Sequence, residues 1–155
     1  MIIRKQFKFE SAHIVRNAVS ERCKFSIHGH SYTVEVFLHG EVDPKTGMLL
    51  DFIEFKKNGI ADFIDMFDHA IAIWNNDSSE YINDMAKHSK RVIKMNLNPT
   101  AENMAIFFHY HIQKILGNDI KVKCVRVHET DTGYAESEQD DLEMNILLFE
   151  YSSHD

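Results

Sequence analysis

Residues 28–39 read HGHSYTVEVFLH, and the alternation of side chains along this stretch is the clearest structural signal in the chain. One parity carries His28, His30, Tyr32, Val34, Val36 and Leu38, whereas the other carries Ser31, Thr33 and Glu35. Because successive side chains of a strand point to opposite faces of a sheet, the pattern predicts a half-buried β-strand. His28 and His30 should therefore project from the same side of that strand.

A second strand is predicted over residues 2–13, where polar and apolar side chains alternate in the same way. One parity holds Arg4, Gln6, Lys8 and Glu10, and the other holds Ile3, Phe7, Phe9, Ser11 and His13. His13 therefore ends this strand on the parity of the phenylalanines. If the two strands pair, a third imidazole arrives beside His28 and His30.

The rest of the chain mixes helical and extended patterns. Helices are expected over residues 52–67, ending around Asp68-His69, over residues 78–90, and over residues 100–116, with Thr100 as N-cap and Gly117 as the stop. Extended segments are expected at residues 91–95, 120–129 and 142–151, the last two separated by an acidic loop through residues 136–141. Paired strands with helices between them favour an α+β fold, with an antiparallel sheet and helices on one face, over a parallel arrangement.

Size and composition limit the classes of protein. The 155 residues, 44% of them hydrophobic, fit a single domain spanning residues 1–155. No apolar run reaches the roughly 18 residues that a membrane span needs, and the first residues lack the apolar region of a signal peptide. We therefore expect a cytoplasmic protein. The formal net charge of −7 disfavours binding to nucleic acid or to an anionic membrane, because both ligands select a basic face.

The three histidines point to a metal site. His28 and His30 lie two residues apart on one strand face, and the intervening Gly29 leaves room for close approach. Two polar strand residues facing solvent would give the same pair, and the two interpretations are equally weighted on the pair alone. His13 on the matching parity favours a metal. Three nitrogens without a nearby thiolate describe an open, catalytic zinc site rather than a closed, structural one.

Several motifs, in order along the chain, resemble one enzyme family. They are FESAH at residues 9–13, a cysteine at Cys23, HGH at residues 28–30, FDH at residues 67–69, NPTAEN at residues 98–103 and VHET at residues 127–130. This set is similar to that of the 6-pyruvoyltetrahydropterin synthase and 6-carboxytetrahydropterin synthase family. The resemblance implies a tunnelling fold, with each subunit contributing ββααββ. It also implies six subunits, a dimer of trimers, whose sheets join into a barrel and whose active sites lie between subunits.

The resemblance also assigns roles to individual residues. It makes His13, His28 and His30 the zinc ligands, Cys23 the proton-abstracting thiolate, Asp68 and His69 the rest of the proton-transfer set, and Glu129 the anchor of the pterin ring. Each of the last four has a structural alternative: Cys23 as an inert loop thiol, Asp68-His69 as a helix terminus, and Glu129 as a solvated charge. Arg16, Arg22 and Lys24 lie near the metal motif and are candidate partners for a triphosphate.

The implied substrate is a small molecule, 7,8-dihydroneopterin triphosphate. We favour the 6-carboxytetrahydropterin synthase reaction, which releases acetaldehyde and triphosphate and whose product feeds queuosine (7-deazaguanine) synthesis. The alternative within the fold is 6-pyruvoyltetrahydropterin synthase, which eliminates triphosphate and keeps every carbon atom. A non-enzymatic zinc-binding module is the alternative from another class. The chain departs from the shortest family members at residues 75–97, which are more polar, and after residue 135.

Overall fold

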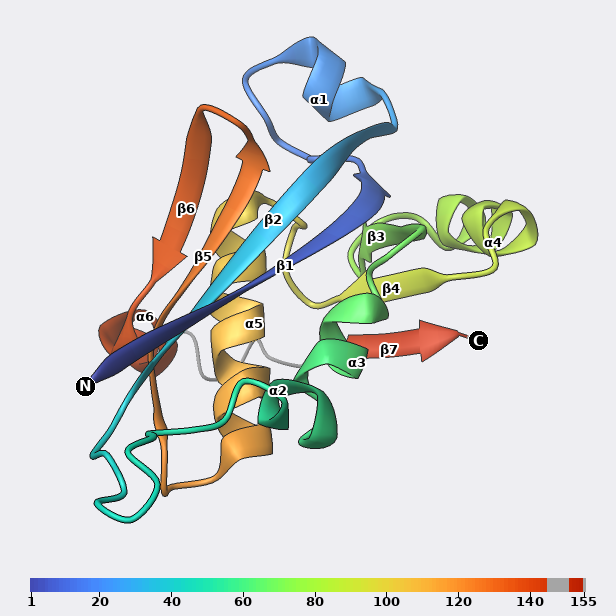
Figure 1. Cartoon of the computed structure of the whole chain (residues 1–155). Coiled ribbons are helices and arrows are strands. Elements are labelled where there is room, and N and C mark those ends of the chain that lie inside the picture. The colour runs from blue at the N-terminus through green and yellow to red at the C-terminus, as the bar shows by residue number, and fades with distance from the viewer. Residues whose placement is uncertain (145–150, 155) are drawn as a thin grey trace.

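The computed structural model describes residues 1–144 and 151–154 (Figure 1). In chain order its elements are β1 (Ile2–His13), α1 (Glu21–Phe25), β2 (His28–His39), α2 (Glu54–Lys57), α3 (Ile60–Asp65), β3 (Ala70–Trp74), α4 (Ser79–His88), β4 (Val92–Met95), α5 (Ala101–Leu116), β5 (Lys121–Thr130), β6 (Gly133–Ser137), α6 (Gln139–Met144) and β7 (Tyr151–His154). The described strands form one seven-stranded sheet in the order β6-β5-β2-β1-β3-β4-β7. The α+β class expected from the sequence is confirmed.

The two long N-terminal strands form the centre of this sheet. β1 and β2 pair antiparallel along their whole length, and His13 lies opposite His28 while Ser11 lies opposite His30. Gly29 faces Ala12 in this ladder, and a Cβ atom at Gly29 would meet the Ser11 carbonyl oxygen at 3.2 Å. The glycine therefore allows close contact of the two strands between the paired histidines.

The sheet is mixed rather than wholly antiparallel. β5 pairs antiparallel with β2, in line with the antiparallel sheet expected from the sequence, and β6, which the sequence did not predict, pairs antiparallel with β5. On the other side of β1, β3 and β4 are added in parallel. The sequence AIAIW of β3 is a short, continuous apolar run, which is typical of a strand buried on both faces, and periodicity does not distinguish such a run from a buried helical segment.

Helices cover both faces of the sheet, in place of the one face expected. α5 begins at the predicted N-cap, where the Thr100 side chain accepts a hydrogen bond from the Asn103 amide at 3.3 Å, and it packs on the main core. α4 packs on the opposite face of the sheet, where it forms a second, smaller core with β3 and β4. This second core consists of Tyr81, Ile82 and Met85 from α4 and Ile71, Ile73 and Val92 from the two strands. The alternate β3 residues, Ala70 and Ala72, belong to the main core.

Two further elements differ from the prediction. The single helix expected over residues 52–67 is two short helices, because Gly59 between them has a left-handed φ of 85° that interrupts the hydrogen-bond ladder. The acidic loop contains β6 and α6, so the strand expected from residue 142 is wrong for residues 142–144. Residues 145–150 of that expected strand lie outside the described residues, and β7 starts at Tyr151. Among the described helices, none combines the length and apolar character that crossing a bilayer requires.

An aromatic cluster between the sheet and α5 is expected to dominate the stability of this fold. Phe67 is fully buried, with ring centroids 4.8 Å from Phe108 and 5.7 Å from Phe9. Phe67→Ala should lower the free energy of unfolding by about 3–5 kcal/mol, since it removes a buried ring and leaves a cavity. Phe52→Ala, at a half-exposed phenylalanine, is the control and should cost far less. Denaturant titration at fixed protein concentration measures both, and equal losses would contradict the assignment of the core.

Candidate metal centre and active site

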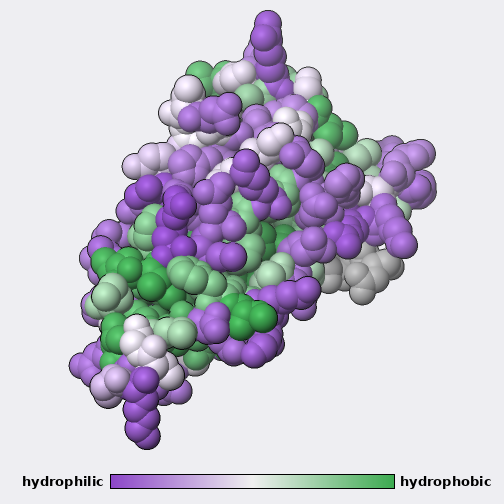
Figure 2. All heavy atoms as spheres, in the orientation of Figure 1, coloured by the Kyte–Doolittle hydropathy of each residue, from purple (hydrophilic) through white to green (hydrophobic). Residues whose placement is uncertain are grey.

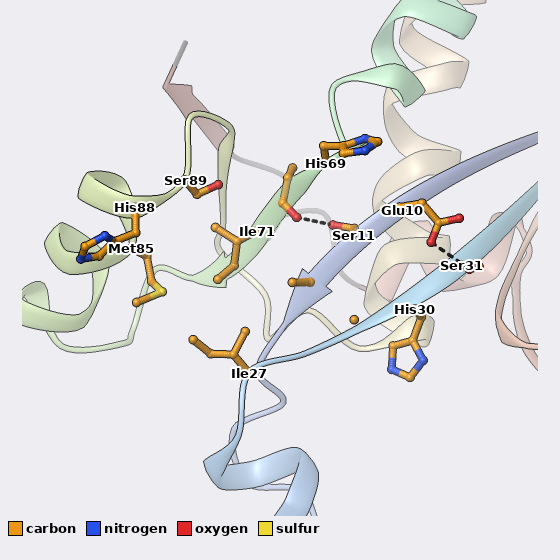
Figure 3. A pocket seen from close by; sticks show the side chains of 13 residues that line it. Glu10, Ser11, Ile27, His30, Ser31, His69, Ile71, Met85, His88 and Ser89 are labelled. Atoms are coloured by element: carbon orange, nitrogen blue, oxygen red, sulfur yellow. Dashed lines mark hydrogen bonds between the residues drawn. The ribbon is translucent and has the colours of Figure 1, made fainter.

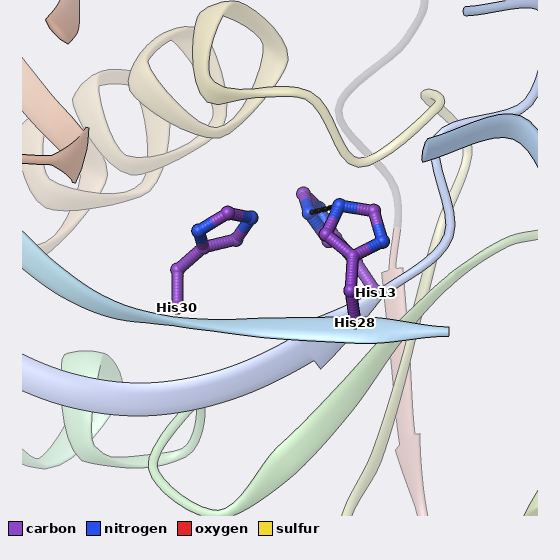
Figure 4. Close-up of side chains that lie close together, drawn as sticks. All are labelled: His13, His28 and His30. Atoms are coloured by element: carbon purple, nitrogen blue, oxygen red, sulfur yellow. Dashed lines mark hydrogen bonds between the residues drawn. The ribbon is translucent and has the colours of Figure 1, made fainter. Parts of the chain in front are cut away.

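Three imidazoles converge at the ends of β1 and β2 (Figure 4). One ring nitrogen from each of His13, His28 and His30 lies within 4.8 Å of the other two, and the Nε2 atoms of His13 and His28 are 3.1 Å apart. The strand register places all three on one face, since His13 lies opposite His28 and the side chains of His28 and His30 leave the same side of β2. The sequence therefore predicted this cluster correctly as a spatial group.

Backbone carbonyls set the tautomer of two of these rings. His13 Nδ1 lies 2.7 Å from the Pro99 carbonyl oxygen, and His28 Nδ1 lies 2.9 Å from the Ser26 carbonyl oxygen. A carbonyl oxygen can only accept a hydrogen bond, so each Nδ1 carries the proton and donates it. Each Nε2 then presents a lone pair toward the other imidazoles.

Burial keeps His13 uncharged. Its side chain is completely buried, and desolvation lowers its pKa from 6.5 to about 4, with the nearby His28 and His30 acting in the same direction against the hydrogen bond to Pro99. A neutral imidazole is the form that binds metal ions.

The three nitrogens fit a metal ion. Two Nε2 lone pairs facing each other at 3.1 Å repel, and a cation between them converts this repulsion into coordination. Two nitrogens bound at 2.0–2.1 Å in a tetrahedral site are about 3.3 Å apart, which is close to the observed separation. The Nε2 atom of His30 is buried without a hydrogen-bond partner among the described residues, as expected of a nitrogen that binds an ion. The group can therefore hold a metal ion.

A carboxylate lies beside the cluster. Glu129 Oε1 is 3.6 Å from His13 Nε2 and 3.9 Å from His30 Nε2. Glu129 is at the end of β5, which pairs with β2 and so brings the acid to the histidines. Burial, together with the negative charge of Glu129, raises the pKa of the Tyr32 hydroxyl, so that Tyr32 stays protonated. Tyr32 shares the parity of His28 and His30, which predicts its place beside them, whereas only the family resemblance indicated that Glu129 belongs to this site.

Cys23 is held near the cluster but is outside it. The residue lies half-buried in α1, and its carbonyl oxygen accepts a hydrogen bond at 3.0 Å from the amide of Val15, two residues beyond His13. The connection between β1 and β2 thus folds back toward the end of β1. Cys23 contributes no atom to the 4.8 Å group of ligand atoms.

His69 lies directly before β3 and beside Glu10, apart from the His30 imidazole in Figure 3. Glu10 and Ser31 alternate with Ser11 and His30 along the paired strands, so their side chains leave the face opposite to that of the His30 imidazole. His69 lines a cavity of about 550 Å³ together with Glu10, Ser31, Met85 and His88, and His30 also lines this cavity. His69 is not part of the 4.8 Å group of ligand atoms formed by His13, His28 and His30.

Backbone contacts fix the Asp68-His69 turn. Asp68 Oδ1 accepts a hydrogen bond from the Glu10 amide at 2.9 Å, and Asp68 Oδ2 lies 2.8 Å from His69 Nδ1. These two hydrogen bonds, from the Glu10 backbone first and then from His69, lower the pKa of the Asp68 carboxyl. Asp68 is therefore ionised and can orient the His69 ring.

Arg16, one of the three candidate triphosphate partners near the metal motif, has partners within the chain. Arg16 is already occupied, since its Nε donates to Asp77 Oδ1 at 2.6 Å and its guanidinium lies over the Tyr81 ring at 4.9 Å. Its backbone amide also donates to the Asn98 side chain. Arg16 thus ties the loop after β1 to the segments before α4 and α5, which is a structural role that the sequence did not predict.

Comparison with known proteins identifies the family. The family model for 6-pyruvoyl tetrahydropterin synthase matches residues 2–140. A 6-carboxy-5,6,7,8-tetrahydropterin synthase of Helicobacter pylori is 41% identical over 151 residues, which cover 92% of this chain and 75% of that protein. The human 6-pyruvoyl tetrahydrobiopterin synthase is 33% identical over 105 residues, which cover 67% of this chain and 61% of that protein.

Solved structures share the fold. An uncharacterized protein of Wolinella succinogenes has a TM-score of 0.72 at 21% identity, covering 90% of this chain and 98% of that one. The 6-pyruvoyl tetrahydropterin synthase of Caenorhabditis elegans has a TM-score of 0.64 at 23% identity, covering 89% and 94% of the two chains. The chain therefore belongs to the 6-pyruvoyl tetrahydropterin synthase family and has the tunnelling fold of its members, as the sequence motifs indicated.

Removal of one imidazole tests the metal centre. His28→Ala should abolish stoichiometric zinc binding, because it deletes one of the three converging lone pairs. His39→Ala is the matched control, since His39 is an exposed histidine at the opposite end of the same strand. Zinc content is measured by elemental analysis after dialysis against a weak chelator. Retention of one zinc per chain in His28→Ala would refute the assignment of this ligand.

Proposed function

We propose that this chain is a zinc-dependent lyase, a 6-carboxy-5,6,7,8-tetrahydropterin synthase. It would convert 7,8-dihydroneopterin triphosphate and water to 6-carboxytetrahydropterin, acetaldehyde and triphosphate, for queuosine synthesis in the cytoplasm. The observation that carries the proposal is the 41% identity, over 92% of the chain, to Helicobacter pylori proteins of that name. The three converging imidazoles support the zinc requirement.

The metal would be zinc held by His13, His28 and His30. When bound, zinc polarises an oxygen atom of the substrate side chain and lowers the pKa of the groups near it. The hydrogen bonds from His13 to Pro99 and from His28 to Ser26 hold these rings in the tautomer that binds the ion. Three protein ligands leave the fourth position for water or substrate.

Glu129 and Cys23 would act on the substrate itself. A carboxylate can accept hydrogen bonds on two oxygen atoms, so Glu129 can take two donors from the pyrimidine edge of a pterin. Its position 3.6 Å from His13 Nε2 would set the ring beside the metal. Cys23 would remove a proton from the substrate side chain as a thiolate, and a nearby metal ion favours that ionised form.

Asp68 and His69 would serve the active site of a neighbouring chain. Glu10 and Ser31, which line this cavity with His69, point to the face opposite to the three imidazoles, while His30 lines the cavity as well, and we place an active site that uses both sets between subunits. An assembly of six chains, a dimer of trimers, would supply such sites. Exposed apolar side chains gather near the chain start and the loop before α2, at the lower left of Figure 2, and include Met1, Ile2, Met48, Phe52 and Ile53. Such a patch is typical of an interaction surface.

The alternative with the same fold is 6-pyruvoyltetrahydropterin synthase, the activity for which the human relative is named. That relative matches a smaller share of this chain, which favours the 6-carboxy reaction. A zinc-binding module without activity would give no reason for the ionised Asp68 to hold His69 at the edge of a cavity.

The product distinguishes these functions. Zinc-loaded protein with 7,8-dihydroneopterin triphosphate should yield 6-carboxytetrahydropterin and an equal amount of acetaldehyde, measured by mass spectrometry and by trapping the aldehyde. Cys23→Ala should bind zinc and substrate normally but lose most turnover, whereas Cys124→Ala, at the other cysteine, is the control. A 6-pyruvoyl product without acetaldehyde would favour the alternative enzyme, and no product would contradict both.

Mixed oligomers test whether the active site is shared. Cys23→Ala and His69→Ala subunits, each with only a small residual activity alone, are co-expressed in equal amounts. If Cys23 and His69 of one active site come from different chains, about a quarter of the sites regain both residues in a random mixture. Activity should then return to roughly that fraction of wild type. Two Cys23→Ala populations mixed together are the control, and a mixture as inactive as its parents would contradict shared sites.

A further inference from the structure

Arg91, in the segment between α4 and β4, contacts the turn that contains Asp68 and His69. Arg91 Nη1 donates to the Asp65 carbonyl oxygen at 2.7 Å and to the Asp68 carbonyl oxygen at 2.9 Å. The Asp68 carbonyl belongs to the peptide bond that enters His69. One guanidinium nitrogen therefore holds two carbonyls of the turn that presents the imidazole.

The backbone of Arg91 holds the other side of the same turn. The Arg91 carbonyl oxygen accepts a hydrogen bond at 3.0 Å from the amide of Ile71, two residues after His69. The Ser89 hydroxyl donates to the same carbonyl at 2.9 Å and so fixes its direction. Arg91 thus contacts the chain on both sides of His69, at Asp68 before it and at Ile71 two residues after it.

This support is significant because His69 is strained. Its φ of 57° lies in the left-handed region, which costs a residue with a Cβ atom about 1–2 kcal/mol. Such a conformation persists only where its surroundings enforce it. The His69 amide donates to the Glu10 carbonyl at 2.7 Å, and the Asp68 carboxylate accepts from the Glu10 amide at 2.9 Å. Arg91 adds two hydrogen bonds from the opposite side of the turn.

The ion pairs of Arg91 are not a sufficient reason for its position. Asp65 Oδ2 lies 3.5 Å from the Arg91 guanidinium, and both side chains are largely exposed, so this pair contributes little to stability. The same segment lines the cavity next to His69, through Met85, His88 and Ser89 (Figure 3). The geometry therefore connects Arg91 to the direction of the His69 ring.

We propose that Arg91 is a positioning residue for His69: by binding the Asp65 and Asp68 carbonyls, it holds the strained backbone that sets the imidazole at the edge of the cavity. The proposal rests on the proton-transfer role given to His69 above. It also gives the polar segment at residues 75–97 a function, because this segment contains Arg91 and places it beside the Asp68-His69 turn.

Kinetics of the full-length, zinc-loaded enzyme provide the first test. Arg91→Ala should lower kcat roughly tenfold or more, since a 1 Å error in the position of a reacting group can cost on the order of 100-fold. KM and zinc content should stay unchanged. Arg91→Lys should give an intermediate kcat, because an ammonium group keeps the charge but lacks the planar fork of the guanidinium. Lys90→Ala, which removes the neighbouring exposed cation, is the matched control and should leave kcat unchanged.

A double-mutant cycle separates positioning from other roles. In a His69→Ala background, Arg91→Ala should cause no further loss of kcat, because its effect acts through the ring already removed. An equal loss in both backgrounds, a higher KM with unchanged kcat, or no effect on kcat would overturn the proposal. If Arg91→Ala does not yield folded protein, Arg91→Lys in the same cycle decides between these outcomes.

An activity-independent measurement separates this proposal from the proposed function. In NMR spectra of the zinc-loaded protein, the ring signals of His69 should shift in Arg91→Ala, while those of His39, at the far end of β2, stay in place. Unchanged His69 signals would overturn the proposal whether or not the enzyme is active. Shifted signals in a protein that makes no pterin product would support the positioning by Arg91 and contradict the proposed function.

Discussion

The register between β1 and β2 is the constraint on which the rest of the site depends. Pairing His13 with His28 and Ser11 with His30 places three imidazoles on one face. A slip of one residue would send His13 to the other face, since side chains alternate along a strand. The apolar residues of the same parity prevent such a slip, because Phe9 and Tyr32 are cross-strand partners that stack with centroids 5.0 Å apart in the core. The packing that stabilises the sheet also assembles the metal site.

A second constraint is electrostatic. The Pro99 and Ser26 carbonyls take the Nδ1 protons of His13 and His28, so lone pairs point at one another in a largely buried space. Without a cation this arrangement is unfavourable, because the lone pairs repel one another. Protonation of His13 would remove the repulsion, but burial lowers the pKa of His13 and so disfavours its protonated form. The chain thus keeps a locally costly arrangement that an ion relieves, which is common at functional sites.

The parts predicted from the sequence were those with a strong local signal. Alternation identified β1 and β2 and, through their parity, the imidazole cluster. The predicted N-cap Thr100 and the predicted stop at Gly117 are the residues that flank α5. The parts that were missed depend on tertiary contacts: β3 reads as a bare apolar run, β6 lies within an acidic stretch, and the position of α4 follows from a sheet face that only β3 and β4 create. The carbonyl partners of the histidines were also missed, because any residue type supplies a carbonyl.

The parallel extension of the sheet fixes where His69 lies relative to the imidazole cluster. β3 joins β1 with Ser11 opposite Ala70, so the preceding His69 lies beside Glu10, and the Glu10 side chain leaves the face opposite to the three imidazoles. The proposed reaction, which uses both the imidazole cluster and His69, would bring the face of one chain against the opposite face of another. A heterologous contact of this kind gives a ring where its rotation closes. The strand arrangement itself thus favours the assembly that the proposed reaction needs.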